Sequence, residues 1–245
     1  MPSNIYRYEV TKESGEAFEF ETADGVFVPT HTSQLLIQAA RERIRAPGKL
    51  LDLGCGIGIL GLTLARLGFC RPPVFFSDLS DQALATARRN AQRMEVAAEF
   101  RQGPLFEPWT GERFDCVIAD VPGISEEIAR LSPWFPEGIE CRTGRDGTTL
   151  VVQALEQAPS HLNEGGTLLF PILSLSRESR ILEAARAHFP EVDLVCQQTW
   201  LLPEQLKNHM EKLQLLREEG AIQILQKVGM WLWTVKVYQA SGAKG

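Results

Sequence analysis

One stretch, Lys49–Leu62, constrains the fold of this chain more than any other. It begins with a short apolar run, which predicts a buried strand. Glycines at alternate positions follow, and an apolar helical pattern begins at Ile59. A strand, a glycine-rich loop and a helix start form the arrangement that receives an anionic or nucleotide-like ligand at a helix N-terminus. Because glycines have no side chain, they permit the tight turn and let a ligand touch the backbone.

The glycines alone do not identify the ligand. Residues 56–61 read Gly-x-Gly-x-x-Gly, which by itself predicts an NAD-dependent oxidoreductase. The discriminating residue is Asp52, an acid inside an otherwise apolar strand, because a buried carboxylate is costly unless something pairs with it. It would repel a pyrophosphate and would hold the ammonium group of an amino acid. S-adenosylmethionine joins an amino-acid end to a nucleoside end and fits both features. The alternative is that Asp52 only caps the turn by accepting loop amides.

A second acid follows the next predicted strand. Val74–Phe76 predicts that strand, and Ser77-Asp78-Leu79-Ser80 closes it. Asp78 stands roughly twenty residues after the loop, where an acid accepts the ribose hydroxyls of a nucleoside. The alternative is that Asp78 or Ser80 caps the next helix. Asp81 is also available as the cap, which leaves Asp78 free for a ligand.

Composition limits the class of protein and the partners. The 245 residues are 44% hydrophobic and 23% charged, as in an ordinary globular α/β protein. The formal net charge of -6 argues against broad binding to phosphate backbones, so nucleic acid is the less favoured partner. The sequence does not indicate an oligomeric state.

Cysteine usage and hydropathy bear on the compartment. The five cysteines include no C-x-x-C pair and the four histidines are scattered, so neither a disulfide framework nor a metal site is expected. The N-terminus lacks the apolar core of a signal peptide. No run approaches the ~20 apolar residues of a membrane span. We therefore expect a cytoplasmic protein that does not bind membranes.

Strands alternate with helices along the chain, which predicts an α/β fold. The sheet is expected to be doubly wound, mostly parallel and seven-stranded, Rossmann-like, with an antiparallel last strand. The expected strands are two within 1–24, then 49–53, 74–76, 97–101, 114–119, 167–172, 192–202 and 231–238. The expected helices cover 33–44 (capped by Ser33 or Thr32), 59–67, 82–94, 148–162, 177–188 and 203–219, with a long loop over 124–147. We expect a single domain over 1–245, with a cover over 1–45, a cofactor-binding core over 46–175 and C-terminal strands and helices over 176–245.

Several motifs in this order carry a family likeness between Val26 and Ile172. Besides the glycine loop and the Ser77–Ser80 stretch, they are Val26-Phe27-Val28-Pro29, Leu105-Phe106-Glu107-Pro108, Gly144-Arg145-Asp146-Gly147 and Leu162-Asn163-Glu164-Gly165-Gly166. The chain resembles class I S-adenosylmethionine-dependent methyltransferases, and within them the HemK-like "methyltransferase small domain" family of glutamine methyltransferases. The resemblance implies S-adenosylmethionine as cofactor. It implies these cofactor contacts: Asp52, Gly54, Cys55, Gly56, Gly58, Asp78, Leu79, Pro104, Leu105 and Asp120.

The chain also departs from that family. The family carries Asn-Pro-Pro-Tyr after its fourth strand, whereas residues 120–123 here read Asp-Val-Pro-Gly. Gly123 thus replaces the aromatic residue that packs on a planar acceptor. Pro104 stands where the family has an acid that contacts the adenine. We also expect no counterpart of the helical domain that recruits the family's protein substrate.

The candidate catalytic residues are Asp120, Val121, Pro122 and His31. Asp120 is expected to accept a hydrogen bond from an acceptor N–H or O–H, and the Val121 carbonyl to be a second acceptor. His31 is a candidate general base. The alternatives are that Asp120 caps a turn and that His31 is an exposed loop residue without a role. Three loop aromatics are candidates to replace the missing ring or to pack in a core or lid: Trp109, Trp134 and Phe135.

The sequence thus predicts an enzyme that methylates a nitrogen or oxygen of a protein side chain or small molecule. A nucleic-acid N-methyltransferase is an alternative. A protein that binds the cofactor without catalysis is another, because Val121 and Gly123 depart from the motif. The oxidoreductase is disfavoured by Asp52.

Overall fold

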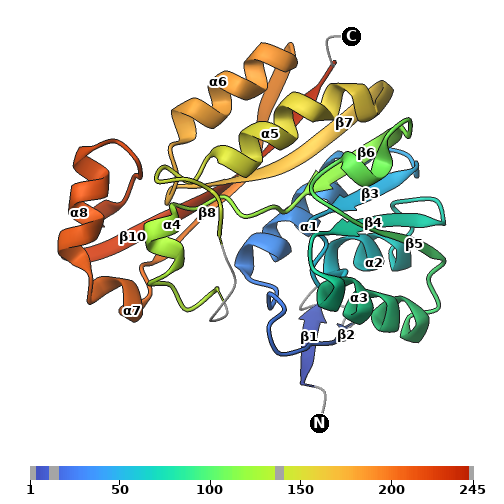
Figure 1. Cartoon of the computed structure of the whole chain (residues 1–245), viewed down its shortest axis with the longest axis horizontal. Helices are drawn as coiled ribbons and strands as arrows, with labels where there is room; N and C mark the ends of the chain where they lie inside the picture. The colour runs from blue at the N-terminus through green and yellow to red at the C-terminus, as the bar shows by residue number, and fades with distance from the viewer. Residues whose placement is uncertain (1–3, 11–16, 136–140, 243–245) are drawn as a thin grey trace.

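The computed structural model describes residues 4–10, 17–135 and 141–242 (Figure 1). In this part of the chain, the main sheet has the order β5-β4-β3-β6-β7-β10-β8, and the short β9 pairs with β10. Its strands are β3 (Leu50–Leu53), β4 (Val74–Asp78), β5 (Ala98–Gln102), β6 (Phe114–Ala119), β7 (Leu162–Leu173), β8 (Glu191–Leu201), β9 (Leu225–Lys227) and β10 (Met230–Ser241). β10 runs antiparallel to β7, β8 and β9, and the other pairs from β5 to β7 are parallel. The predicted mostly parallel sheet with an antiparallel last strand is confirmed, but the predicted number of seven strands is wrong, because the short β9 makes the sheet eight-stranded.

Helices cover both faces of this sheet. They are α1 (His31–Arg43), α2 (Ile59–Arg66), α3 (Asp81–Arg93), α4 (Glu126–Ala129), α5 (Thr149–Gln157), α6 (Glu178–His188), α7 (Glu204–Lys207) and α8 (Met210–Glu218). The buried residues of α1, α2 and α3 belong to one hydrophobic core, which also takes in α4, α7 and α8. Those of α5 and α6 belong to a second core on the other face. Among the described residues, no helix is both long and apolar enough to cross a bilayer.

Gly61 sets how closely α2 packs on the sheet. A Cβ atom at this position would lie 2.5 Å from Cε1 of Phe76 on β4. The third glycine of the 56–61 motif therefore has a packing role, and the helix N-terminus is held tightly against the strand ends.

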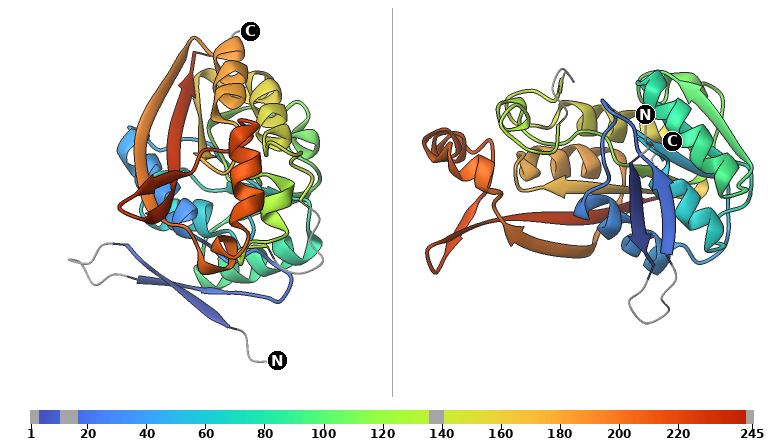
Figure 2. Two further views of the ribbon diagram at one scale, coloured as in Figure 1. Left: turned by 90° about the vertical axis from the view of Figure 1, so that its left-hand side faces the viewer. Right: turned by 90° about the horizontal axis from the view of Figure 1, so that it is seen from below.

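A two-stranded hairpin, β1 (Ile5–Glu9) and β2 (Ala17–Glu21), confirms the hairpin predicted within 1–24 and projects from the main body (Figure 2). The buried Asn90 of α3 ties it down. The Asn90 Nδ2 group donates to the carbonyls of Glu21 (3.1 Å) and Ile57 (3.0 Å), and its Oδ1 accepts the Glu21 N–H (2.7 Å). One side chain thus joins the hairpin to the glycine loop.

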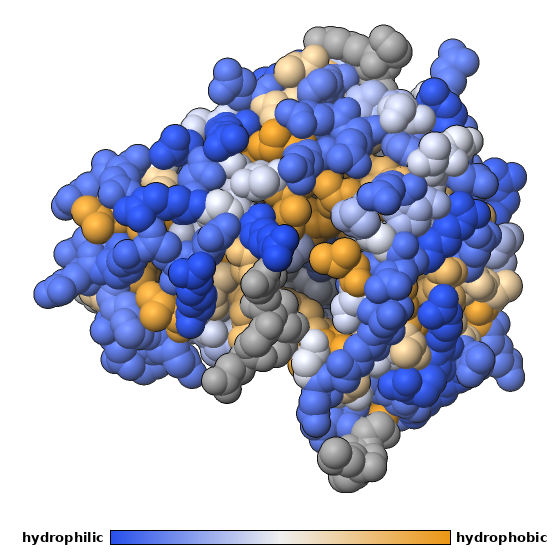
Figure 3. Space-filling model, in the orientation of Figure 1, coloured by the Kyte–Doolittle hydropathy of each residue, from blue (hydrophilic) through white to orange (hydrophobic). Residues whose placement is uncertain are grey.

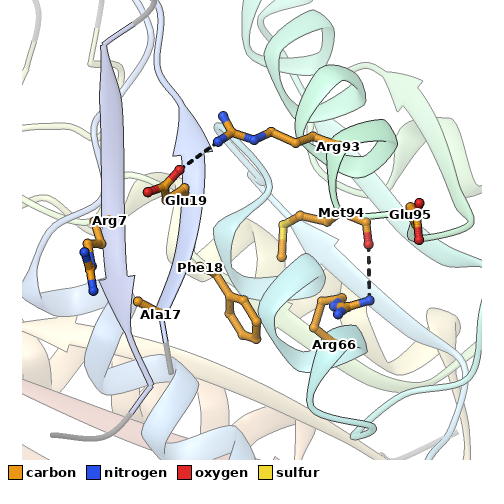
Figure 4. Close-up of a pocket in the computed structure, with 8 residues that line it drawn as sticks. All are labelled: Arg7, Ala17, Phe18, Glu19, Arg66, Arg93, Met94 and Glu95. Carbon is orange, nitrogen blue, oxygen red and sulfur yellow. Dashed lines mark hydrogen bonds and ion pairs between the residues drawn. The ribbon is translucent and has the colours of Figure 1, made fainter. Parts of the chain in front are cut away.

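A groove separates the hairpin from the ends of α2 and α3, and Figure 4 shows its lining. Its volume is about 450 Å³, Phe18 lies on its hairpin side, and Arg66 and Met94 lie on its helix side. The ion pair between Arg93 and Glu19 (2.8 Å) spans it.

β8 and β10 extend past the carboxyl end of β7. The pairing of β10 with β7 ends at Val235 and Leu173, whereas Met230–Thr234 continues alone with β8 and β9. We call this part of β8, β9 and β10 the overhang. It carries α7 and α8 and lies at the left of Figure 1.

Several predicted boundaries were wrong. The strand predicted over 167–172 begins at Leu162, and the helix predicted over 203–219 is divided into α7 and α8. Three other differences have a clear local reason. α1 begins two residues before Ser33, because the Thr30 side chain accepts the Thr32 N–H (3.2 Å) and is the N-cap in place of Ser33 or Thr32. The helix predicted to reach 162 ends at Gln157, because Pro159 cannot continue an α-helix. A short helix, α4, interrupts the loop predicted over 124–147, of which 136–140 lie outside the described residues.

Candidate active site

The glycine loop is built as predicted between β3 and α2. Gly54, Gly56 and Gly58 all have positive φ (76°, 53° and 83°), which side-chain-bearing residues rarely adopt. The N–H groups of Gly54 and Cys55 donate to the Ser77 carbonyl at 2.9 and 3.0 Å, so the loop is anchored to the end of β4. A Cβ atom on Gly56 would meet only the Phe27 carbonyl, 3.9 Å away. The loop therefore presents bare backbone to an open space, whereas the Cys55 side chain is buried.

Asp52 is fully buried beneath this loop. Its Oδ2 accepts the Gly61 N–H at 2.9 Å, in the first turn of α2, whose N-cap Gly58 has no side chain. Its Oδ1 has no hydrogen-bond partner in the structure. Burial raises the pKa of this carboxyl to about 8, and the charges of Asp120 and Asp78 add to the increase. Asp52 thus caps a helix with one oxygen, as the alternative interpretation has it, and keeps the other oxygen unpaired.

Asp78 lies at the carboxyl end of β4, facing the loop. Its Oδ2 accepts the Gly56 N–H and its Oδ1 accepts the Ser80 N–H, both at 2.9 Å. Burial raises the pKa of its carboxyl. The helix cap is Ser80, which accepts the Ala83 N–H at 3.2 Å. Asp78 is therefore not the cap of α3. It stabilises the glycine loop through the Gly56 N–H, and its predicted contact with ribose hydroxyls stays a prediction.

An uncovered apolar surface adjoins Asp78. The apolar side chain of Leu79 is 70% exposed. Gly103 donates to the Asp78 carbonyl (3.1 Å), which brings the turn after β5 beside it. In that turn Pro104 is exposed, and Leu105 is half-buried with a positive φ of 46°. The structure thus gathers these three predicted contacts on one side of the loop.

Asp120 follows β6, the strand beside β3, on the other side of the loop. The Ser33 hydroxyl donates to its Oδ2 at 3.0 Å. Burial raises the pKa of the Asp120 carboxyl to about 6, against the lowering effect of this hydrogen bond. Val121 is buried against Gly54, whose added Cβ would lie 3.2 Å from Val121 Cγ1, and Pro122 is exposed. Ser33 was missed in the sequence, although a serine on the apolar face of a predicted helix is a signal.

His31 is the exposed first residue of α1, not a loop residue as predicted. Its ring lies 5.3 Å from that of Trp200 at the end of β8. The same turn of α1 therefore presents Ser33 to Asp120 and His31 to the overhang. Trp200 was not singled out in the sequence.

The candidate loop aromatics lie in different places. Trp109 is fully buried in the second core against Phe75 and Phe114, so it is not available to replace the missing ring. Trp134 and Phe135 are half-buried and lie in the first core beside α1. Figure 3 shows a hollow near the centre of the face seen in Figure 1, between the part with α3, β4 and β5 and the part with α4, α7 and α8.

Three carboxylates surround the glycine loop: Asp52, Asp78 and Asp120. In the described part of the chain, none of them forms an ion pair. Such a site favours a ligand that brings positive charge and hydroxyl donors. A pyrophosphate would add negative charge beside these acids.

Comparison with known proteins agrees with this geometry. Residues 17–130 match the family described as the methyltransferase small domain. A release factor glutamine methyltransferase of Geobacter sulfurreducens is 30% identical over 156 residues, which cover 62% of this chain and 54% of the relative. One of Bacillus subtilis is 31% identical over 180 residues, covering 68% and 62%. The chain thus spans a little more than half the length of these curated relatives.

Solved structures share the fold. A T. thermophilus 16S rRNA N2 G1207 methyltransferase, solved with AdoMet and guanosine, matches with a TM-score of 0.61 and 18% identity, covering 97% of this chain and 50% of that one. A ribosomal protein L11 methylase from Lactobacillus delbrueckii subsp. bulgaricus matches with a TM-score of 0.52 and 18% identity, covering 88% and 80%. At this identity the likeness shows the fold alone.

Proposed function

We propose that this chain transfers a methyl group from S-adenosylmethionine to a nitrogen or oxygen of a small molecule or protein side chain. Support comes from the match of residues 17–130 to the methyltransferase small domain and from the similarity to release factor glutamine methyltransferases. The observation that carries this proposal is the set of three unpaired carboxylates around a bare glycine loop. The cofactor has a sulfonium and an ammonium group at one end and ribose hydroxyls at the other, so its charges and donors match these acids.

The residues present fit this cofactor. The unpartnered Oδ1 of Asp52 is the acceptor proposed for the ammonium group, and Asp78 is proposed to accept the ribose hydroxyls. The exposed Leu79, with Pro104 and Leu105, offers apolar surface for the adenine. The backbone of Gly54, Cys55, Gly56 and Gly58 surrounds the remainder.

When bound, the cofactor supplies a methyl group already activated by its positive sulfur. The protein therefore needs mainly to position the acceptor and exclude water. Asp120, next to Gly54, is proposed to accept the N–H or O–H of the acceptor and to orient its lone pair. The Val121 carbonyl is proposed as a second acceptor, with Pro122 fixing the turn. His31 is proposed as a base only for acceptors that reach the overhang.

Calorimetric titration with S-adenosylhomocysteine and, separately, NAD tests the cofactor. We expect micromolar binding of S-adenosylhomocysteine to the wild type and its loss in Asp52→Ala. Asp81→Ala is the matched control, because Asp81 is an exposed acid in the first turn of α3. Binding of NAD without S-adenosylhomocysteine would overturn the proposal.

A protein acceptor has separate support, because the curated relatives are named for release factor glutamine methylation. The Asp-Val-Pro-Gly sequence at 120–123 departs from their motif, so glutamine is one acceptor to test and not the expected one. Turnover on a release-factor glutamine peptide would establish it. Cofactor binding without turnover on any acceptor would favour a non-catalytic binding protein.

We also propose a cytoplasmic location. All five cysteines are free, as is usual in a reducing compartment. Cell fractionation with an antibody against the full chain tests this.

A further inference from the structure

The turn after β6 carries no aromatic ring and is closely packed at Gly123. Gly123 is buried, and a Cβ added there would lie 3.0 Å from Val151 Cγ2 on α5. Even the first atom of a side chain would force Val151 to shift. A ring that packs on the methyl acceptor must therefore come from another part of the fold.

Rings from four other segments meet in one row, His31–Trp200–Trp233–Trp134, which we call the aromatic row. Successive ring centroids are 5.3, 5.5 and 4.8 Å apart. These distances are typical of favourable ring contacts. Trp233 is nearly buried in the middle of the row, while Trp200 and Trp134 are half-buried and His31 is exposed. The centre of the row is thus held by packing, and the other three rings keep part of their surface exposed.

The row stands beside the proposed methyl-transfer site. Trp200 and Trp233 are paired residues of the overhang, beyond the last pair of β10 with β7. β8 is three strands away from β6, which corresponds to about 14 Å at the usual strand spacing. The first turn of α1 bridges this span, because Ser33 contacts Asp120 and His31 contacts Trp200. Trp200 and Asp120 are thus linked through contacts with one turn of α1.

A second pair of rings includes a residue whose backbone is close to the glycine loop. Phe27 and Phe135 meet edge to face with centroids 5.1 Å apart. The Phe27 carbonyl is the atom nearest to a Cβ added at Gly56, so the backbone of Phe27 approaches the glycine loop. The segment that carries Phe27 therefore lies near the glycine loop, and the basic side chain in the aromatic row is His31.

We propose that the methyl acceptor is a small, planar, fused-ring aromatic molecule that rests on the aromatic row and presents an N–H or O–H group to Asp120. This inference rests on the proposed methyl transfer. In the reaction, a lone pair of the acceptor nitrogen or oxygen forms the new bond to the methyl carbon. The bond between that carbon and sulfur breaks, its electron pair stays on sulfur, and the acceptor proton passes to the Asp120 carboxylate.

Binding of matched probes tests the inference. The protein is first saturated with S-adenosylhomocysteine, and failure of this step would count against the proposed function and not against the row. It is then titrated with 6-hydroxyquinoline and with decahydro-2-naphthol, a neutral fused-ring alcohol that carries a hydroxyl without a flat ring. We expect measurable binding of the aromatic probe alone.

Two variants locate that binding. Trp200→Leu should weaken 6-hydroxyquinoline binding about tenfold or more, because stacking on one aromatic side chain contributes roughly 1–3 kcal/mol. His31→Ala, at an exposed position, should weaken it several-fold and guards against misfolding of the first variant. Trp231→Leu is the control, because Trp231 shares a face of β10 with Trp233 but is not part of the aromatic row, and its ring centroid lies 6.0 Å from the guanidinium carbon of Arg217 on α8. All three should keep wild-type affinity for S-adenosylhomocysteine.

Three results would overturn the inference. The first is binding of both probes alike, or of neither, to protein that binds S-adenosylhomocysteine. The second is unchanged affinity of Trp200→Leu and His31→Ala for the aromatic probe. The third is tighter binding of a glutamine peptide or an oligonucleotide in a way that these two variants do not affect.

Discussion

The hydroxyl of Ser33 donates a 3.0 Å hydrogen bond to Oδ2 of Asp120, across 87 residues of sequence. Ser33 is itself buried in the first turn of α1. Burial raises the pKa of Asp120, and this bond lowers it by stabilising the ionised carboxylate. The pKa that results is about 6. A helix packed over the site therefore influences the protonation of the residue proposed to orient the acceptor.

Replacing Ser33 by alanine should raise the pKa of Asp120, because one hydrogen bond to the charged form is lost. A contribution of about 1 kcal/mol corresponds to roughly one pH unit. We expect the acidic limb of the rate profile to move up by about that amount, measured as kcat/KM against pH. Ser33→Thr keeps the hydroxyl and should restore the wild-type profile. An unshifted profile in Ser33→Ala would show that the bond does not tune Asp120.

Replacing Asp52 by asparagine should stabilise the ligand-free protein in alkaline solution. The pKa of Asp52 is about 8 in the folded chain and about 4 in an unfolded one. The folded state thus binds the proton more tightly, and this group's contribution to stability is lost as pH rises through that window. Asparagine still offers Gly61 an acceptor and has no charge to bury. Its melting temperature relative to wild type should therefore be higher at pH 8 than at pH 5. A difference independent of pH would contradict this account.

Ligand binding should release a proton near neutral pH. Below pH 8 the buried Asp52 carboxyl is largely protonated, and an ammonium group beside its Oδ1 favours the carboxylate. S-adenosylhomocysteine should therefore bind more tightly as pH rises from about 6 to about 8. Calorimetry in phosphate and in Tris measures the release, because the two buffers differ in ionisation enthalpy. Identical heats in both buffers would argue against Asp52 as the ammonium partner.

Replacing Asn90 by alanine should loosen the hairpin and the glycine loop together. Asn90 is fully buried, and its loss leaves the Ile57 and Glu21 carbonyls without their donor. We expect a loss of roughly 2–3 kcal/mol in unfolding free energy, with weaker S-adenosylhomocysteine binding. Arg93→Ala is the control on the same helix, because it removes only the exposed ion pair with Glu19 and should cost less than about 1 kcal/mol. Urea unfolding measures both variants, and equal losses would refute a special role for Asn90.

Local sequence patterns predicted the glycine loop and the strands around it well. The strand before the loop, the bounds of β6 and the positions of Asp52 and Asp78 depend on neighbours a few residues apart, where hydropathy and glycine spacing are informative. Such patterns could not predict that the two carboxylate oxygens of Asp52 have different roles. That one oxygen caps α2 at Gly61 and the other stays unpaired depends on how the helix seats against the strand.

The surroundings of Asp120 and Trp200 were predicted less well, because they are assembled from distant segments. Ser33 meets Asp120, and His31 meets Trp200, only once α1 lies across the sheet. Trp109 gave no local sign of which face it would occupy, and the structure buries it in the opposite core. The sequence pattern shows only that Trp109 lies in a turn between two strands. The path of that turn over the sheet decides which of the two cores the side chain joins.

The overhang of β8 and β10 has a consequence for how such an enzyme diversifies. The loop that would hold the cofactor is built from β3, β4 and β6, whereas Trp200 and Trp233 stand on strands that have already left β7. Substitutions at Trp200 or Trp233 alter the aromatic row, which is the proposed acceptor surface, and leave every residue of the glycine loop unchanged. Under the proposed function, changes at the far end of two strands can therefore exchange one acceptor for another while the glycine loop stays unchanged.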